Sequence, residues 1–431
     1  MDHGAVTATA FSRPQEKSST AGNKGFLTRI ESVRGLAALC VALTHAAGFL
    51  LLIDHDVVLL GRSSIRGFVL DVFYGFFNGE TAVILFFVIS GVVIGRALDA
   101  RRSGFVHFLI RRVFRLYPAH IVATLGIVGL GWLFLTGTPP LDFTSYPDLG
   151  ALHAAWLNGE SFNPLKPRSV VGTLTMAGWS LNLVIWSLYA EMCAAPLLPI
   201  FHNLNRRGSG WLDAGVLTLL IGLSLLNWDH LWSRYLFVFY LGMMVETRGV
   251  LLASAIERAL GGSWPALGFF YLLTVLPNTF AATRSPLVIL LEAIGAFGVV
   301  SVVVRSEGRP ALASLEHPLL RWNGRLSYSF YLWHYFILTL AVRGLYASLS
   351  PEVMQRFQVP LFVAVVVVTV AIALAVAQIS YSYVELPFMK LGRMVLGGWR
   401  QERPAWSKAT PAVATARRSW TGRAEHQNAS S

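Results

Sequence analysis

One apolar segment near the N-terminus carries an arginine and a histidine at a helical spacing. Arg34 and His45 lie eleven positions apart in IESVRGLAALCVALTHAAGF. Two such positions differ by about 20° around a helix and by roughly 16 Å along it, so both side chains share one face. A guanidinium binds anions, and an imidazole acts as a general base or as a nucleophile near neutral pH. An interfacial arginine and a histidine bonded between helices are the plainer alternatives, but the shared face favours a joint catalytic role.

A basic motif, FLIRRVFRLYPAH, follows the second apolar segment. Arg111 and Arg115 are four positions apart and share a helix face, whereas Arg112 points elsewhere. Pro118, directly after Tyr117, suits the first turn of a helix. Grouped guanidinium groups bind phosphate in a bidentate manner, so the motif is a candidate phosphate site. Basic residues at the cytoplasmic end of a membrane helix are the alternative explanation.

A carboxylate and a hydroxyl share a face in the segment WSLYAEM. Ser187 and Glu191 are four positions apart, and an apolar run, CAAPLLPIF, follows Glu191. We therefore expect Glu191 to lie within the membrane. A buried carboxylate can orient a histidine or accept a proton, and it can also pair with a structural arginine.

A polar stripe runs along RWNGRLSYSFYLWHYFIL. Ser327, Tyr331 and His334 step by four and three positions, which places them on one face of an otherwise apolar helix. An aromatic belt at the membrane surface would account for Tyr328 and Trp333 but not for His334. The stripe therefore predicts a lined cavity. Farther along the chain, Pro387 is expected to end the last apolar helix.

The composition indicates a membrane protein. The 431 residues are 54% hydrophobic and only 13% charged, against about 25% charged in soluble domains. A net charge of +12 on a soluble protein would suggest nucleic acid, but in a membrane protein its distribution between loops matters more. Two cysteines in apolar stretches, Cys40 and Cys193, predict neither a disulfide framework nor a metal site.

We expect an all-α integral membrane protein with about ten transmembrane helices in one bundle. This domain should span residues 29–396, between a disordered N-terminal tail (1–28) and a disordered basic C-terminal tail (397–431). A spanning helix needs roughly 20 mostly apolar residues. The candidate spans are 30–53, 80–98, 117–137, 180–202, 211–227, 232–247, 264–282, 286–304, 327–347 and 358–382.

The distribution of basic residues sets the expected orientation. With ten spans, 26 of the 35 Lys and Arg residues fall on the side of the two termini and eight fall on the other. Basic residues collect in cytoplasmic loops, so both termini are expected in the cytoplasm and the protein in the inner (cytoplasmic) membrane as a multi-pass protein.

Six separated motifs, in order, resemble the acyltransferase type 3 family of membrane proteins. They are RGLAALCVALTH, FFVISGVVI, FLIRRVFRLYP, WSLYAE, LSYSFYLWH and VELP, between about residues 29 and 390. The family acylates sugars of lipopolysaccharides, exopolysaccharides, Nod factors and some antibiotics, mostly in bacteria, and its membrane domain typically has ten helices. Some relatives carry a further hydrolase-like domain, and this chain resembles the short form without it.

The resemblance assigns roles to the singled-out residues. Arg34 and His45 match the family's Arg-ten-His motif. The other matching residues are Arg111, Arg112, Arg115, Tyr117 and Pro118 in the third-helix basic motif, Trp186, Ser187 and Glu191 in the WSL motif, and Ser327, Tyr331 and His334 in the late Ser-Tyr-His pattern.

The resemblance implies a membrane O-acyltransferase. An acyl group, acetyl being the commonest, would pass from cytoplasmic acyl-CoA to a sugar hydroxyl of a lipid-linked or exported polysaccharide or glycolipid. Acyl-CoA would be a co-substrate, with no permanently bound cofactor, no metal and no nucleic-acid partner. Three arginines would bind its phosphates and Arg34 would guide it. His45 would be the general base or carry the acyl group, and Glu191 would assist. Both routes stay open, as does the oligomeric state.

A transporter of a small polar substrate is the alternative function. Polar stripes on several helices and interrupted spans also suit a substrate path. Many transporters contain related halves, however, and the Arg-ten-His pattern has no counterpart after residue 215. A hybrid, in which the acyl group itself crosses the membrane through the bundle, also remains open.

Overall fold

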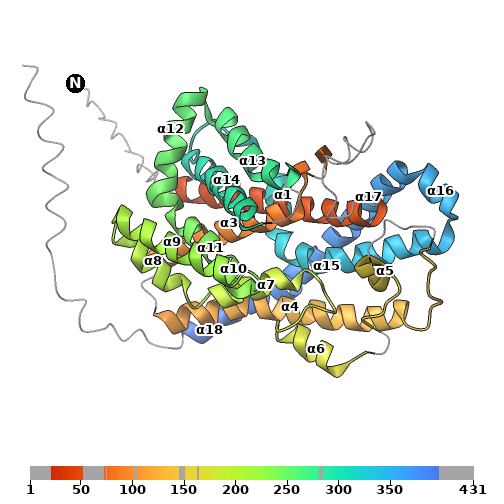
Figure 1. The fold of residues 1–431 in the computed structure, drawn as a ribbon. Helices are drawn as coiled ribbons and strands as arrows, with labels where there is room; N and C mark the ends of the chain where they lie inside the picture. Colours follow the sequence, from red (N-terminus) through yellow and green to blue (C-terminus); the bar gives the residue numbers. More distant parts are fainter. Residues whose placement is uncertain are drawn as a thin grey trace, which may run out of the picture.

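The computed structural model describes residues 21–51, 72–73, 75–100, 104–144, 151–162, 165–280 and 285–397. Every regular element among these residues is a helix, which confirms the all-α prediction (Figure 1). Most of the two predicted tails, residues 1–20 and 398–431, lies outside this part of the chain. Residues 21–28 of the predicted N-terminal tail belong to the first helix.

The helices follow one another along the whole described part of the chain. In chain order they are α1 (Ala21–Leu50), α3 (Gly79–Ala100), α4 (Phe105–Leu135), α5 (Ala151–Leu157), α6 (Pro167–Leu174), α7 (Ile185–Ala194), α8 (Leu198–Arg206), α9 (Gly210–Leu226), α10 (Leu231–Arg234), α11 (Leu236–Met244), η2 (Val245–Gly249), α12 (Val250–Leu260), α13 (Ser263–Phe280), α14 (Pro286–Arg305), η3 (Ala313–Glu316), α15 (Pro318–Ser348), α16 (Pro351–Arg356), α17 (Gln358–Ser380), η4 (Tyr381–Glu385) and α18 (Leu386–Gly397).

Six helical stretches in the described residues are long and apolar enough to cross a membrane, which supports a membrane protein. They are Thr28–Leu50, Gly79–Asp99, Phe105–Leu135, Leu231–Leu260, Pro286–Arg305 and Gln358–Gly397. Each overlaps one of the ten predicted spans. The other four predicted spans correspond to the 17-residue α9, to α13, to α15 and to the broken pair α7 and α8.

Several predicted boundaries were wrong. The span 180–202 is not one helix, because α7 ends at Ala194 and α8 begins at Leu198, in a stretch that contains Pro196 and Pro199. The third helix begins at Phe105 instead of residue 117, so Pro118 lies inside it. Proline removes one backbone donor, and membrane helices tolerate this where neighbouring groups bond to the backbone.

The last apolar helix does not end at Pro387. It widens into the π-helical turn η4 and continues as α18 to Gly397. Pro387 is the second residue of α18, next to the wide turn, where the helix hydrogen-bond pattern is already interrupted. The side chain of Phe114 on α4 packs against Gly392, so α18 lies along α4.

Helices α1 and α15 cross closely in the middle of the bundle. A Cβ atom on Gly324 would lie 2.1 Å from the Glu31 carbonyl oxygen, and one on Gly35 would lie 2.7 Å from the Gly324 nitrogen. Small residues allow such close approach of membrane helices. In Figure 1, α12, α13 and α14 lie on one side of α1 and α3, and α4 and α18 lie on the other.

Replacing Gly324 by alanine should therefore destabilise the fold by about 1–3 kcal/mol, the usual cost of overpacking. The added methyl group would push α15 away from the Glu31 carbonyl. Thermal unfolding in detergent measures the effect. A methyl group added to Gly344, on the same helix, would meet no atom within 4 Å. Gly344→Ala is the matched control and should not lower the melting temperature; equal losses in both variants would contradict the close crossing.

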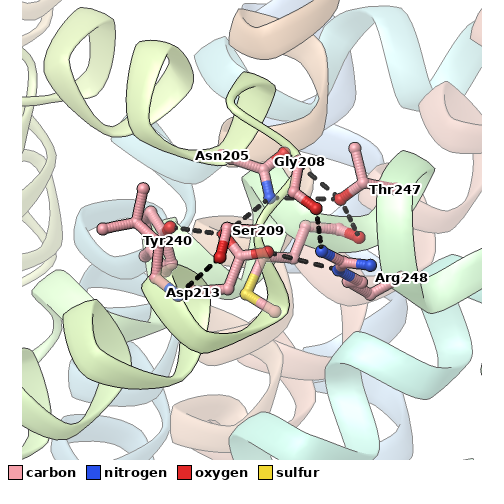
Figure 2. Close-up of polar contacts among 9 residues, drawn as sticks. Asn205, Gly208, Ser209, Asp213, Tyr240, Thr247 and Arg248 are labelled. Atoms are coloured by element: carbon pink, nitrogen blue, oxygen red, sulfur yellow. Dashed lines mark hydrogen bonds and ion pairs between the residues drawn. The ribbon is translucent and has the colours of Figure 1, made fainter.

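A buried polar cluster fastens the short helices α8 and α9 to η2 (Figure 2). Asp213 accepts hydrogen bonds from Tyr240 (2.7 Å), Asn205 (3.2 Å) and Arg248 (3.2 Å). Arg248 also donates to the Gly208 carbonyl oxygen at 2.8 Å. Asp213 is therefore fully paired, and the cluster serves to stabilise this part of the bundle.

Candidate active site

The structure contains a cavity between α1, α3, α4, α7 and α15. It holds about 800 Å³ of space free of protein atoms, including its open mouth. Residues predicted from four separate motifs meet at its walls, namely Arg34, Arg112, Arg115, Ser187, Glu191, Ser327 and Tyr331. The remaining predicted residues lie outside the lining.

Arg34 is held in this cavity by α15. Its Nε donates to the Ser327 hydroxyl at 2.8 Å, and its Nη2 donates to the Gly324 carbonyl oxygen at 3.0 Å. The close crossing of α1 and α15 brings these groups together. Arg34 is therefore positioned by two hydrogen bonds instead of lying along the membrane surface.

Glu191 pairs with an arginine. Its Oε1 accepts a hydrogen bond from Arg112 Nη2 and another from the Ser90 hydroxyl at 2.7 Å. Arg112 Nη2 also donates to Ser90 at 3.2 Å, and Arg112 is only 8% exposed. Of the two roles considered for Glu191, the structure thus shows the arginine pairing, and it records no contact of Glu191 with a histidine among the described residues.

The arginine face that lines the cavity is not the predicted one. Arg112 and Arg115 both line it, but Arg111 does not. Arg111 and Arg115 are one turn apart, as predicted, but the face of α4 turned towards the cavity is the one that carries Arg112 and Arg115. Arg115 makes no hydrogen bond or ion pair within the part of the chain that the structure describes, so its guanidinium can bind a ligand.

Tyr331 stands where the cavity meets a pair of histidines. Its hydroxyl lies 2.8 Å from the Ser187 hydroxyl and 3.3 Å from the Val184 carbonyl oxygen. Its ring is 5.6 Å from the His334 ring, centre to centre. The Ser187–Tyr331 pair therefore separates the arginine-lined cavity from the histidines.

His45 and His334 stack on each other beyond this pair. Their ring centres are 5.6 Å apart with 28° between the planes, and Tyr335 packs edge-on against His45 at 4.8 Å. His334 Nδ1 lies 2.9 Å from the Tyr331 carbonyl oxygen, which can only accept, so Nδ1 carries the proton. The His334 Nε2 is buried and has no hydrogen-bond partner among the described residues, so its lone pair can accept a hydrogen bond.

Two other predicted site residues lie away from the cavity. The Trp186 ring packs against Tyr235 at 5.8 Å, and the Tyr117 ring packs against His120 at 6.2 Å. These contacts are those of core aromatic side chains. The pattern of the sequence did not distinguish them from residues that line the site.

Sequence reasoning missed two polar residues of the cavity lining, Ser90 and Tyr328. Ser90 bonds to Glu191, although the pair Ser90-Gly91 in an apolar helix indicates only close packing. Tyr328 also lines the cavity and donates to the Leu116 carbonyl oxygen at 2.7 Å. Ser90 precedes Gly91 in the motif FFVISGVVI, and Tyr328 follows Ser327 in LSYSFYLWH. Membership of these motifs was the only feature of the sequence that could have pointed to them.

The lining suits an elongated ligand with an anionic end. Ser90 on α3 bonds to Arg112, and Phe86, one turn earlier on α3, packs against Tyr331, which in turn contacts His334. The lining therefore passes from the arginines along an apolar wall that includes Val83 and Phe87 to the histidines. No group of three or more His, Cys, Asp or Glu residues within the described part of the chain could hold a metal ion. The arrangement can bind an anion at one end and move a proton at the other.

Comparison with known proteins identifies the family of the chain. Residues 27–378 match the acyltransferase domain that defines a protein family. The chain is 28% identical over 340 residues to the exopolysaccharide production protein ExoZ of Rhizobium meliloti (strain 1021), covering 73% of this chain and 91% of that protein. No solved structure matches the chain. The chain therefore belongs to the acyltransferase type 3 family of membrane proteins.

Proposed function

We propose that this protein is an O-acyltransferase that moves an acetyl group from cytoplasmic acetyl-CoA to a sugar hydroxyl of a lipid-linked or exported polysaccharide. The observation that carries the proposal is the cavity with arginines at one end and the stacked histidines beyond the other. Family membership favours an acyltransferase over a transporter. The name of the ExoZ relative favours an exopolysaccharide acceptor.

The donor would bind along the cavity. Arg115, whose guanidinium is unpaired among the described residues, binds a phosphate of CoA, and Arg34 binds farther in. The pantetheine arm lies along Phe86 and Phe87 and carries the thioester towards Tyr331. The excess of basic residues on the side of the termini supports entry of the donor from the cytoplasm.

The histidine pair would carry the proton. In the direct route, an imidazole nitrogen takes the proton of the acceptor hydroxyl as its oxygen attacks the thioester carbonyl. The carbon–sulfur bond then breaks, and the leaving thiolate receives the proton, which releases CoA as a thiol. In the two-step route a nitrogen of His45 attacks the thioester carbonyl, the carbon–sulfur bond breaks, and CoA leaves as a thiol with the proton that the imidazole gives up. The sugar hydroxyl then attacks the acyl-imidazole, and its proton returns to the freed imidazole nitrogen.

Arg115→Gln tests the donor end of the cavity. Loss of one charge-assisted hydrogen bond to phosphate should raise the KM for acetyl-CoA by about tenfold or more. The measurement is transfer of labelled acetyl from acetyl-CoA by the purified protein, with a glycolipid extract as acceptor. Arg111→Gln, one turn away and outside the lining, is the matched comparison and should change the KM less. The reverse order would place the donor on the other face of α4.

A further inference from the structure

A second cavity lies on the opposite side of α1 and α3, between these helices and α13 and α14. It contains about 1020 Å³ of space free of protein atoms, including its mouth. Its walls are almost entirely apolar. Lining residues include Ala37, Cys40, Leu85, Leu267, Tyr271 and Val299.

This cavity, here called the lateral groove, is open to the outside of the bundle. Leu36, Phe76 and Trp264 line it and are 37%, 38% and 55% exposed. Since α1, α3 and α14 are long and apolar enough to cross the membrane, the groove would open to hydrocarbon chains at that mouth. From Val33 to Cys40 the groove follows α1 for about 10 Å, which suits part of an extended chain.

One end of the lateral groove holds an unsatisfied polar group. Asn78 lines this end, and its Oδ1 accepts hydrogen bonds from the backbone nitrogens of Glu80 (2.9 Å) and Thr81 (3.1 Å). Its Nδ2 is buried and has no hydrogen-bond partner among the described residues, and Asn78 is 3% exposed. A buried amide donor without a partner favours an oxygen-bearing ligand.

The same end of the groove lies at the height of His45 along α1, on a neighbouring face of that helix. The Phe77 carbonyl oxygen, next to Asn78, accepts a hydrogen bond from the Thr44 hydroxyl. Thr44 directly precedes His45, whose ring stacks on His334. A molecule whose chain fills the groove would therefore hold its head group at the height of His45, from where an attached sugar can extend around α1 towards the histidines.

We infer that the lateral groove binds the hydrocarbon chain of the lipid that carries the acceptor sugar, with Asn78 donating a hydrogen bond to a head-group oxygen. This inference rests on the proposed function, because it assigns the acceptor to a lipid-linked sugar. Donor and acceptor lipid then bind on opposite sides of α1 and α3, and the sugar, extending beyond Asn78 around α1, meets the thioester near His45.

Filling the groove tests the inference. Gly268 lines it, and a methyl group there would meet no atom within 4 Å, so leucine can enter the groove without a clash. Gly268→Leu should lower labelled acetyl transfer to the lipid fraction about tenfold, the loss expected when about two methylene groups no longer fit. Gly222→Leu on α9, where space is equally open, should transfer as the wild type does. Equal transfer by both variants would overturn the inference.

Labelling of Cys40 tests occupancy without relying on transfer. Cys40 lines the groove, and Cys193→Ser leaves it as the single thiol. The protein is placed in nanodiscs of phosphatidylethanolamine and phosphatidylglycerol, with or without the glycolipid fraction of polysaccharide-producing cells. The glycolipid should slow alkylation of Cys40 severalfold. Equal rates would mean that ordinary phospholipid fills the groove and would overturn the inference, whereas absence of acetyl transfer by the wild type would refute only the proposed function.

Discussion

His45→Ala is expected to lower acetyl transfer by about 10²–10⁴-fold, the usual contribution of a general acid–base group. The reason is structural as well as chemical. His45 stacks on His334, and the Ser187–Tyr331 pair separates both from the arginine-lined cavity. His45 is therefore proposed to be the imidazole at which donor and acceptor meet. The measurement is initial transfer of labelled acetyl from acetyl-CoA to the glycolipid extract.

The control for this variant is a histidine away from the site. His230 is exposed at the start of α10, so His230→Ala should transfer acetyl normally. Melting temperatures of both variants show whether a loss reflects unfolding. Wild-type protein given labelled acetyl-CoA alone distinguishes the two routes, because an acyl-histidine would retain label without acceptor. Normal transfer by a folded His45→Ala protein would remove His45 from the mechanism.

The second large effect concerns the buried pair of Arg112 and Glu191. Removing one partner, as in Arg112→Met or Glu191→Met, should destabilise the protein by about 3 kcal/mol, because a charge remains buried without its partner. Arg112 is 8% exposed and Glu191 22%, so water compensates only in part. The double variant should recover most of this loss, since apolar residues of similar volume often replace a buried pair without cost.

The same set of variants separates structural and functional roles. The free energy of unfolding is measured by denaturation with SDS in mixed micelles, and the KM for acetyl-CoA is measured on each folded variant. If Arg112 also binds the donor, the double variant should be stable yet have a raised KM. A double variant as unstable as the sum of the single ones would show that Arg112 and Glu191 do not stabilise each other.

Much of the site could be predicted because helical spacing is local. The residues on one face of a helix follow from 3.6 residues per turn, so the Ser327–Tyr331 stripe was recognised from its spacing alone. The order of the motifs pointed to the family, which the comparison confirms. Composition likewise predicted a membrane protein, because 13% charged residues is far below the usual fraction of soluble domains, and the long apolar runs predicted helices.

The rotation of each helix could not be predicted. On α4, spacing showed that Arg111 and Arg115 share a face. In the folded protein Phe114 packs against α18, and Arg112 lines the cavity with Arg115, whereas Arg111 does not. The partner of Glu191 was equally out of reach. Both Ser90 and Arg112 are distant from it in the chain, and only the folded bundle brings the three together.

The sequence by itself determined that the chain is a helical membrane protein with a candidate arginine and histidine on one face of its first helix. Periodicity and hydrophobicity are local properties, and they are sufficient for this. Tertiary structure alone decided that Arg34 bonds to Ser327, that His45 stacks on His334, and that an apolar groove lies behind both. These features depend on how helices approach and rotate against one another, which is set by contacts between residues far apart in the chain.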